Sequence, residues 1–301
     1  MPPLALPYSW QELEPEETAR IQQNFPVSAI SDLVRYDNGL LMPRAYITIA
    51  EKLYNFPLRD DDIWIVTFPK TGTTWTVEMT WMLVNDVDKV KGEKPQLLRS
   101  PFLEVGSLMG EMPMPEGMAG DMVEMMTDTL AYAETLTERR VLKSHLPIEF
   151  LPPGITKRCK VIYVARNPKD TCVSYYFHNL SMPGHGYVGD FPQFAEDFAS
   201  GLQLYGDFFS HVLSGWRVKD DPNVRFLWFE DMKKNQREII KDMCIFLDHP
   251  LTSEQVDRLV EHLKFENMKL NMSTNPTAGF NLKSDFMRKG VVGVSPHLIT
   301  S

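Results

Sequence analysis

The chain has 301 residues and a mass of 34.6 kDa, with 43% hydrophobic residues, a formal net charge of −9 and a pI near 5.3. This size suits one large α/β domain, and the acidic balance excludes a global field that attracts nucleic acid, so any anion site has to be built locally. No apolar run approaches the ~18 residues of a membrane span and the N-terminus lacks a basic and apolar leader, so we expect a cytoplasmic protein with no membrane partner.

The first elements along the chain are a short amphipathic helix and a buried strand. Residues 43–56, PRAYITIAEKLYNF, place apolar side chains at helical spacing. An acidic triplet then leads into an apolar run that predicts a strand over 62–68. Apolar residues at i, i+4, i+7 and i+8, starting from Trp75, predict a helix directly after that strand.

Between that strand and that helix lies TFPKTGTTW, Thr67 to Trp75. Gly72 lets the backbone bend close to a ligand, and the main-chain N–H groups from Thr71 onward can face an anion at the positive end of the helix. Lys70 adds an ammonium group. The pattern indicates a phosphate or sulfate site, and it differs from the GxxxxGK[ST] motif because its lysine precedes the glycine.

Residues 104–138 are rich in methionine, with seven of the seventeen methionines of the chain placed among glycine and proline. Such a composition is not typical of a rigid core element, and methionine adapts to varied apolar shapes. Two interpretations stay open, a surface excursion and a mobile lid over a ligand site.

A second buried strand, RVLK at 140–143, runs into KSHLP. Lys143 and His145 are two residues apart, so on an extended chain their side chains point the same way. A neighbouring positive charge lowers the pKa of a histidine, which leaves His145 neutral and able to accept a proton. A single histidine is more often structural, so both interpretations stay open at this point.

A third buried strand, KVIYVA at 160–165, ends in VARNPKDTCVSYYFHN. Arg166 lies at the carboxyl end of the strand, and Ser174 lies about two turns into the helix predicted over 169–180. A guanidinium fork and a hydroxyl at this place suit a second phosphate. A surface ion pair is an equally common role for one such arginine.

The remaining elements complete an alternating pattern of strands and helices. A fourth strand is predicted over 224–229, and helices are predicted over 192–218, 232–247 and 252–263. We expect a single α/β domain over residues 1–301, with a central parallel sheet, helices on both faces and a P-loop-like phosphosulfate-binding turn. Ligands of such sheets bind at the carboxyl ends of the strands.

Near the C-terminus, FMRKGVVG contains a short basic clamp of Arg288, Lys289 and the flexible Gly290, a combination that is usually a solvated charge pair. Together with the two turns above, it gives two phosphate-sized sites, a candidate base and several cations. This combination predicts a ligand that carries phosphates at two positions.

In this order the motifs resemble those of the cytosolic sulfotransferases, which use 3′-phosphoadenosine 5′-phosphosulfate (PAPS) and release adenosine 3′,5′-bisphosphate (PAP). The resemblance covers about residues 46–290. TFPKTGTTW is similar to the family's 5′-phosphosulfate loop, VARNPKDTCVSYY to its 3′-phosphate element and FMRKG to its C-terminal clamp. KSHLP contains the position of its catalytic histidine.

The resemblance implies a role for each matching residue. His145 would deprotonate the acceptor, Lys70 would stabilise the departing 5′-phosphate, and Lys143 would hold the sulfuryl oxygens. No metal is implied, because lysines neutralise the charge. The implied cofactor-binding residues are Lys70, Thr71, Gly72, Thr73, Thr74, Trp75, Arg166, Ser174, Phe229, Phe265, Phe286, Arg288, Lys289 and Gly290. The implied substrate-binding residues are Tyr46, Phe102 and His178.

The sequence departs from the family pattern in three places. Phe229 stands where the family usually has tyrosine, and Leu263-Lys264-Phe265 stands where it has Thr-Ser-Phe at the adenine edge. After RKGVVG the chain continues as VSPHLITS instead of the family's Asp-Trp-Lys and its dimer motif. We therefore expect a monomer with a loosely ordered clamp.

The sequence thus predicts an enzyme that transfers a sulfuryl group from PAPS to a hydroxyl of a small, largely apolar acceptor. Phenols, steroid-like alcohols and isoprenoid alcohols all fit this description, and residues 104–138 are the candidate lid over the acceptor. A non-catalytic member of the family that binds PAPS or PAP is the alternative. A P-loop kinase fits less well, because the lysine is misplaced and a second phosphate site would have no purpose.

Overall fold

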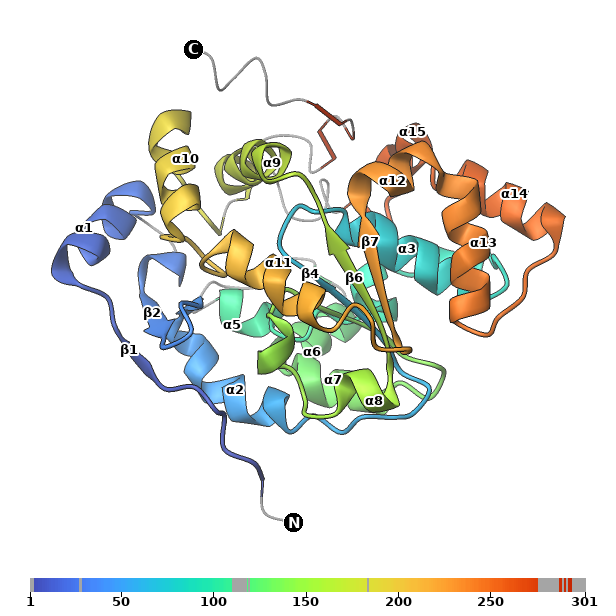
Figure 1. Ribbon diagram of the computed structural model, residues 1–301, viewed down its shortest axis with the longest axis horizontal. Coiled ribbons are helices and arrows are strands. Elements are labelled where there is room, and N and C mark those ends of the chain that lie inside the picture. Colours follow the sequence, from blue (N-terminus) through green and yellow to red (C-terminus); the bar gives the residue numbers. More distant parts are fainter. Residues whose placement is uncertain are drawn as a thin grey trace.

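Four parallel strands form the centre of the molecule in the order β5-β4-β6-β7 (Figure 1). They are β4 (Ile63–Thr67), β5 (Val141–Ser144), β6 (Lys160–Ala165) and β7 (Val224–Trp228). Each strand overlaps the strand predicted from the sequence, so the predicted fold class is confirmed. The computed structural model describes residues 3–26, 29–109, 118, 120–182, 184–275, 287, 288, 290, 292 and 293.

Alternate side chains of the sheet enter two separate hydrophobic cores. In β4, Ile63 and Ile65 face one core, and Trp64 and Val66 face the other, all of them fully buried. This alternation follows from the two-residue repeat of a strand, and burial on both faces explains why the strand sequences are almost wholly apolar.

The first core is covered by helices on the side shown at the right of Figure 1. These are α3 (Thr73–Val84), α12 (Phe229–Lys234), α13 (Gln236–Phe246), α14 (Ser253–His262) and α15 (Phe265–Leu270). The second core is covered by α2 (Ile47–Tyr54), α5 (Val105–Met109), α6 (Gly120–Thr127), α7 (Thr129–Thr135), α8 (Ile155–Arg158), α9 (Pro168–Ser181), α10 (Phe191–Ser200) and α11 (Phe208–Arg217). Between α3 and α5 lies the single turn α4 (Gln96–Arg99).

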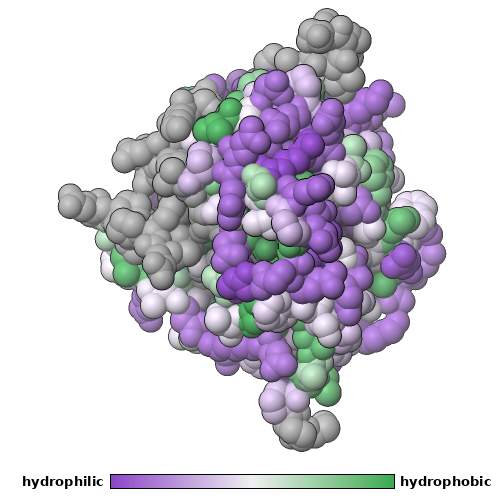
Figure 2. All heavy atoms as spheres, turned by 90° about the vertical axis from the view of Figure 1, so that its left-hand side faces the viewer, coloured by the Kyte–Doolittle hydropathy of each residue, from purple (hydrophilic) through white to green (hydrophobic). Residues whose placement is uncertain are grey.

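A small antiparallel sheet, which the sequence analysis did not predict, adds to the second core. It consists of β1 (Trp10–Glu12), β2 (Leu33–Tyr36) and β3 (Leu41–Pro43), and α1 (Pro15–Asn24) connects its first two strands. The face with α1, β1 and α10 is mostly hydrophilic (Figure 2), and Arg20 of α1 is paired with Glu196 of α10 there. Strands of three or four residues give too short an alternation to be recognised in the sequence.

The single helix predicted over 192–218 is wrong, because two helices occupy this range. Gly201 ends α10 in the left-handed conformation, with φ 75°, and its main-chain N–H donates to the carbonyl of Asp197. Asp207 then caps α11 by accepting hydrogen bonds from Phe209 and Ser210. The apolar periodicity runs through this break, but a left-handed glycine and a new N-cap end one helix and start another.

Part of the methionine-rich stretch 104–138 is packed into the core, contrary to the interpretation as a surface excursion. Met125 and Met126 are 0% and 2% exposed, and Leu130 and Ala133 of α7 are buried beside them. Residues 110–117 and 119 lie outside the described residues. Methionine here fills an irregular space between short helices, which suits its flexible side chain.

Candidate active site at the carboxyl ends of the strands

Each central strand delivers a candidate functional residue just beyond its carboxyl end. Lys70 follows β4, His145 follows β5, Arg166 follows β6, and Phe229 follows β7. Because parallel strands end at the same edge of a sheet, residues from four distant parts of the chain meet there. The described residues of the segment 287–293 lie at this edge beside α9 (Figure 1), and the main-chain N–H of Gly293 donates to Asp170 at 2.7 Å.

The loop from Thr67 to Thr73 is held in an unusual conformation. Lys70 and Gly72 both have positive φ, 68° and 113°. A Cβ at Gly72 would lie 2.7 Å from the ring of Phe229, so only glycine fits this close approach. The hydroxyls of Thr67 and Thr73 lie 2.7 Å apart. The loop therefore turns sharply into the N-terminus of α3, as an anion-binding turn requires.

The side chain of Thr71 has a structural role in this loop. Its side chain is fully buried, and its hydroxyl lies 2.9 and 3.0 Å from the carbonyls of Phe68 and Val164, to which it donates. The hydroxyl is thus used to fix the loop to β6. Any contact of Thr71 with an anion is left to its main-chain N–H.

Four cations from separate segments share this edge of the sheet. Burial, together with the charges of Lys143, Arg166 and Arg288, lowers the pKa of Lys70 to about 7. Burial lowers the pKa of Lys143 to about 8, although Glu104 opposes the change. A polyanion that enters the cluster would favour the charged form of both lysines, because its negative charge attracts each ammonium group.

His145 is neutral and has a defined tautomer. Its Nδ1 lies 2.8 Å from the main-chain carbonyl of Thr67, which can only accept, so Nδ1 carries the proton and donates it. The Nε2 atom therefore keeps a lone pair. Burial, reinforced by the charge of Lys143, holds the pKa of His145 well below its usual range. The imidazole is ready to accept a proton, as general-base catalysis requires.

Glu104 supports His145, and the sequence analysis gave it no role of its own. Its Oε1 accepts a hydrogen bond from the main-chain N–H of His145 at 2.6 Å and another from the Tyr205 hydroxyl at 3.3 Å. Burial raises the pKa of Glu104 to about 7, which the hydrogen bond from His145 and the charge of Lys143 oppose. A lone carboxylate inside the apolar run PFLEV was the only signal that could have drawn attention to it.

Aromatic side chains surround the His145 imidazole. The rings of Phe102 and Tyr205 lie edge-on to it, with centroids 5.0 and 5.5 Å away. The Lys143 ammonium lies 4.1 Å from the centre of the Phe102 ring. This wall is apolar except for the groups that touch His145 and Lys143, so it suits an acceptor that is apolar around one hydroxyl.

Two further predicted acceptor residues lie near this wall. Tyr46 is fully buried with its ring 6.0 Å from that of Tyr36, and its hydroxyl has no hydrogen-bond partner among the described residues. His178 lies edge-on to His185 at 5.0 Å, and burial with the nearby charge of Lys70 holds the pKa of His178 well below its usual range. Burial also lowers the pKa of His185 to about 4, and the sequence analysis missed this second imidazole.

A second set of predicted residues lies on the other side of the loop. The Arg166 guanidinium lies over the Phe229 ring at 4.4 Å and donates to the carbonyl of Lys70 at 3.1 Å. The Phe229 ring lies 6.0 Å from that of Trp75. These edge-on rings place aromatic surface next to cations, which suits a purine with an adjacent phosphate.

The C-terminal clamp reaches the same place. The Arg288 guanidinium lies 4.3 Å from the ring of Phe177 on α9, the helix that also contains Ser174. A Cβ at Gly290 would lie within van der Waals overlap of the Phe265 ring, so this glycine is pressed against α15. Phe286 and Lys289 lie outside the described residues. Apart from these two, the structure brings the predicted phosphate-binding residues to one end of the sheet.

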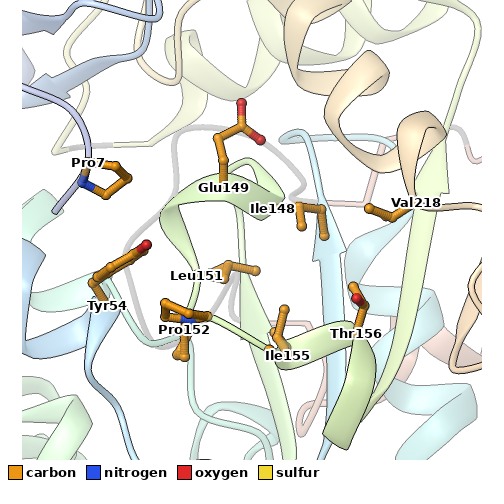
Figure 3. Close-up of a pocket in the computed structure, with 11 residues that line it drawn as sticks. Pro7, Tyr54, Ile148, Glu149, Leu151, Pro152, Ile155, Thr156 and Val218 are labelled. Atoms are coloured by element: carbon orange, nitrogen blue, oxygen red, sulfur yellow. The ribbon is translucent and has the colours of Figure 1, made fainter. Parts of the chain in front are cut away.

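Two other features are separate from this cluster. A cavity of about 280 Å³ lies among Pro7, Tyr54, Val218 and residues 148, 149 and 151–156 (Figure 3), and it shares no residue with the site. In the part of the chain that the structure describes, no group of three or more His, Cys, Asp or Glu is placed to hold a metal ion. None of the described helices has the length and apolar character of a membrane span.

Comparisons with known proteins show which proteins this chain is similar to. Residues 60–297 match the model of the sulfotransferase domain. Human sulfotransferase 1E1 is 35% identical over 263 residues, which cover 85% of this chain and 84% of that protein. A crystal structure of retinol dehydratase with androsterone and the inactive cofactor PAP is similar with a TM-score of 0.88 and 30% identity, over 96% of this chain and 91% of the other. A structure of retinol dehydratase with retinol and PAP gives the same values.

Proposed function

Because this chain belongs to the sulfotransferase family and is a PAPS-dependent enzyme, we propose that His145 is its general base and that its acceptor is a largely apolar alcohol or phenol. The main support is the tautomer of His145, whose Nδ1 donates to Thr67 while Nε2 keeps its lone pair, and the charge of Lys143 helps to keep the ring neutral. A base in this state accepts the hydroxyl proton of an acceptor without first losing one of its own.

The residues at the edge of the sheet fit PAPS. Gly72 leaves room for close approach of a ligand to the backbone, and the helix α3 N-terminus and Lys70 supply positive charge for the 5′-phosphosulfate. Arg166 and Arg288, with the hydroxyl of Ser174, are suited to the 3′-phosphate. Trp75, Phe229 and Phe265 supply aromatic surface for the adenine.

The reaction needs little covalent help from the protein. Bound PAPS supplies the sulfuryl group, and its 5′-phosphate is the leaving group. His145 takes the acceptor proton at Nε2, while Lys70 stabilises the charge that grows on the departing phosphate and Lys143 stabilises the sulfuryl oxygens. By analogy with phosphoryl transfer, positioning and electrostatics give most of the rate.

The acceptor side supports a bulky apolar substrate. Phe102 and Tyr205 border His145, and Tyr46 extends the apolar surface toward α5, whose first residue follows Glu104. Retinol dehydratase, which is similar in structure, has been solved with androsterone and with retinol. These similarities favour steroid-like and isoprenoid alcohols over small phenols, and we propose that residues 104–138 help to shape the pocket that receives them.

The experiment that tests the proposal is sulfate transfer from radiolabelled PAPS to three acceptors: androsterone, retinol and 4-nitrophenol. Transfer to one of the first two at a higher kcat/KM than to the phenol would support the proposed acceptor class. Preference for the phenol would contradict that class but leave the enzyme assignment. PAP binding without transfer to any acceptor would favour the alternative, a non-catalytic nucleotide-binding protein.

We expect Arg166→Ala to weaken the binding of PAP roughly tenfold to hundredfold more than the binding of adenosine 5′-monophosphate. Only PAP has the 3′-phosphate that the guanidinium would contact. Calorimetric titration with the two nucleotides measures the difference. Arg225→Ala is the matched control, because Arg225 pairs with Asp242 on the half-exposed surface. Equal losses of affinity for both nucleotides would show that Arg166 does not contact the 3′-phosphate.

We also expect PAP binding to take up protons at pH 8. With pKa values of about 7 and about 8, Lys70 and Lys143 are partly neutral in the free protein at that pH, and the phosphates favour their charged forms. The affinity for PAP should therefore fall as pH rises from 7 to 9. Proton uptake by the two lysines should vanish near pH 6, where both are already charged in the free protein. Calorimetry at pH 8 in buffers of different ionisation enthalpy counts the protons.

The matched variant for this measurement is Lys70→Arg, which keeps a positive charge that does not titrate in this range. It should bind PAP with a smaller proton uptake than the wild-type enzyme. Unchanged uptake in this variant would show that Lys70 is already charged in the free protein at pH 8.

A further inference from the structure

The main-chain carbonyl of His145 is held by a second buried histidine. Nε2 of His211, on α11, lies 2.8 Å from that carbonyl, 66 residues away in sequence. Because a carbonyl only accepts, Nε2 of His211 carries a proton and donates it. His211 is 2% exposed, so this hydrogen bond is made away from solvent. The backbone at His145 therefore has a fixed partner on each side, since its N–H donates to Glu104.

The other nitrogen of His211 has an equally defined partner. Nδ1 lies 2.7 Å from the hydroxyl oxygen of Tyr163 on β6, and that oxygen also lies 2.8 Å from the main-chain carbonyl of His211. With Nε2 protonated, Nδ1 of the neutral ring can only accept, so the single proton of the Tyr163 hydroxyl is shared between Nδ1 and the carbonyl of His211. Burial lowers the pKa of His211 to about 4 and raises that of Tyr163, so both groups are neutral near pH 7.

Packing holds α11 against this pair of residues. Gly215 lies one turn beyond His211, and a Cβ there would overlap the Tyr163 ring, so the helix is as close to β6 as a glycine allows. The hydroxyl of Ser214 donates to the carbonyl of His211 at 2.7 Å and accepts from the N–H of Ile148 at 3.3 Å. The segment that follows His145 is thus tied to the same helix.

We propose that His211 is a positioning residue for the general base, with its tautomer set by the carbonyl of His145 and its Nδ1 held by Tyr163. This inference depends on the proposed role of His145. The His145 side chain is fixed by Thr67 and its backbone by Glu104 and His211, so three elements outside β5 determine where Nε2 points. Loss of the His211 hydrogen bond would let the peptide after His145 rotate and move Nε2. A displacement of about 1 Å can cost ~10²-fold in rate.

The test compares two substitutions at one position. His211→Leu removes the donor, whereas His211→Gln keeps an amide nitrogen that can reach the carbonyl of His145. We expect His211→Leu to lower kcat roughly 10- to 100-fold with the Kd for PAP within about twofold of wild type, and His211→Gln to recover most of the loss. Tyr163→Phe should lower kcat by a smaller factor, because Nδ1 of His211 loses its partner while the hydrogen bond from Nε2 to His145 remains. Steady-state kinetics, calorimetry with PAP and thermal unfolding provide the readouts.

Several outcomes would overturn the inference. These are an unchanged kcat in His211→Leu, equal losses of kcat in the Leu and Gln variants, or a loss of PAP affinity that matches the loss of rate. If His211→Leu does not fold, His211→Asn takes its place, because its shorter amide stops short of the carbonyl and should lose activity that Gln retains. Failure of the proposed function is a separate result. If His145→Ala still transfers sulfate, His145 is not the general base, whatever the His211 variants do.

Discussion

Replacement of His145 by alanine is expected to lower sulfate transfer about 10²- to 10⁴-fold and to leave the affinity for PAP within about twofold. The imidazole borders the apolar acceptor wall, with its Nε2 lone pair available and its Nδ1 proton bound to Thr67. Rate loss without affinity loss is the signature of a group that acts on the acceptor. Single-turnover transfer from radiolabelled PAPS and calorimetry with PAP measure the two quantities.

Two further variants make this result specific. His145→Asn retains an amide donor for the carbonyl of Thr67 but has no base, so it should be as inactive as the alanine variant and unfold at a higher temperature. His249→Ala removes a surface histidine that contacts Asp86 and should behave as wild type. A large fall in PAP affinity that parallels the rate would instead mean that His145 is structural.

Replacement of Lys70 by methionine should lower kcat about 10²- to 10³-fold, because the ammonium is the group we place on the departing phosphate. Methionine has a similar length and no charge, and the loop can keep its left-handed backbone at this position, with φ 68°. The Kd for PAP should rise by a smaller factor, since Lys143, Arg166 and Arg288 remain in the cluster. Rapid-quench measurement of a single turnover separates chemistry from binding.

The controls test whether charge or shape matters at this position. Lys70→Arg keeps the charge and should retain more activity than Lys70→Met, and Lys52→Met removes an exposed lysine that pairs with Asp128. If Lys70→Met loses affinity and rate by the same factor, the ammonium binds the ground state and transition state equally. Its catalytic role would then be refuted.

The parts of the site that lie next to one another in sequence were predictable. The turn from Thr67 to Trp75 carries its own glycine, lysine and helix start, and Lys143 and His145 share one strand end. A buried parallel strand has a short, nearly continuous apolar sequence. All four central strands could therefore be predicted at nearly their observed bounds. Local patterns fix local structure, and parallel topology then fixes which ends meet.

The supporting residues were not predictable in this way. Glu104 and His211 contact His145 across 41 and 66 residues, and each lies in a segment with no motif. Their roles come from a hydrogen bond to a main-chain atom, which places no demand on the neighbouring sequence. The break at Gly201 was missed for a related reason, because apolar periodicity continues on both sides of it while the backbone does not.

The residues that we propose for the nucleotide and for the acceptor pack on different cores of the fold. Trp75, Phe229 and Met287 pack on the core beneath α3 and α13, whereas Tyr46, Phe102 and Tyr205 belong to the core on the other side of the sheet. The central strands act as a partition between them. Substitutions in the acceptor-side core can therefore change the acceptor. The core under the nucleotide-binding residues stays the same, because the nucleotide does not change. In an enzyme of this design, substitutions that change the acceptor leave the binding of the shared donor unchanged.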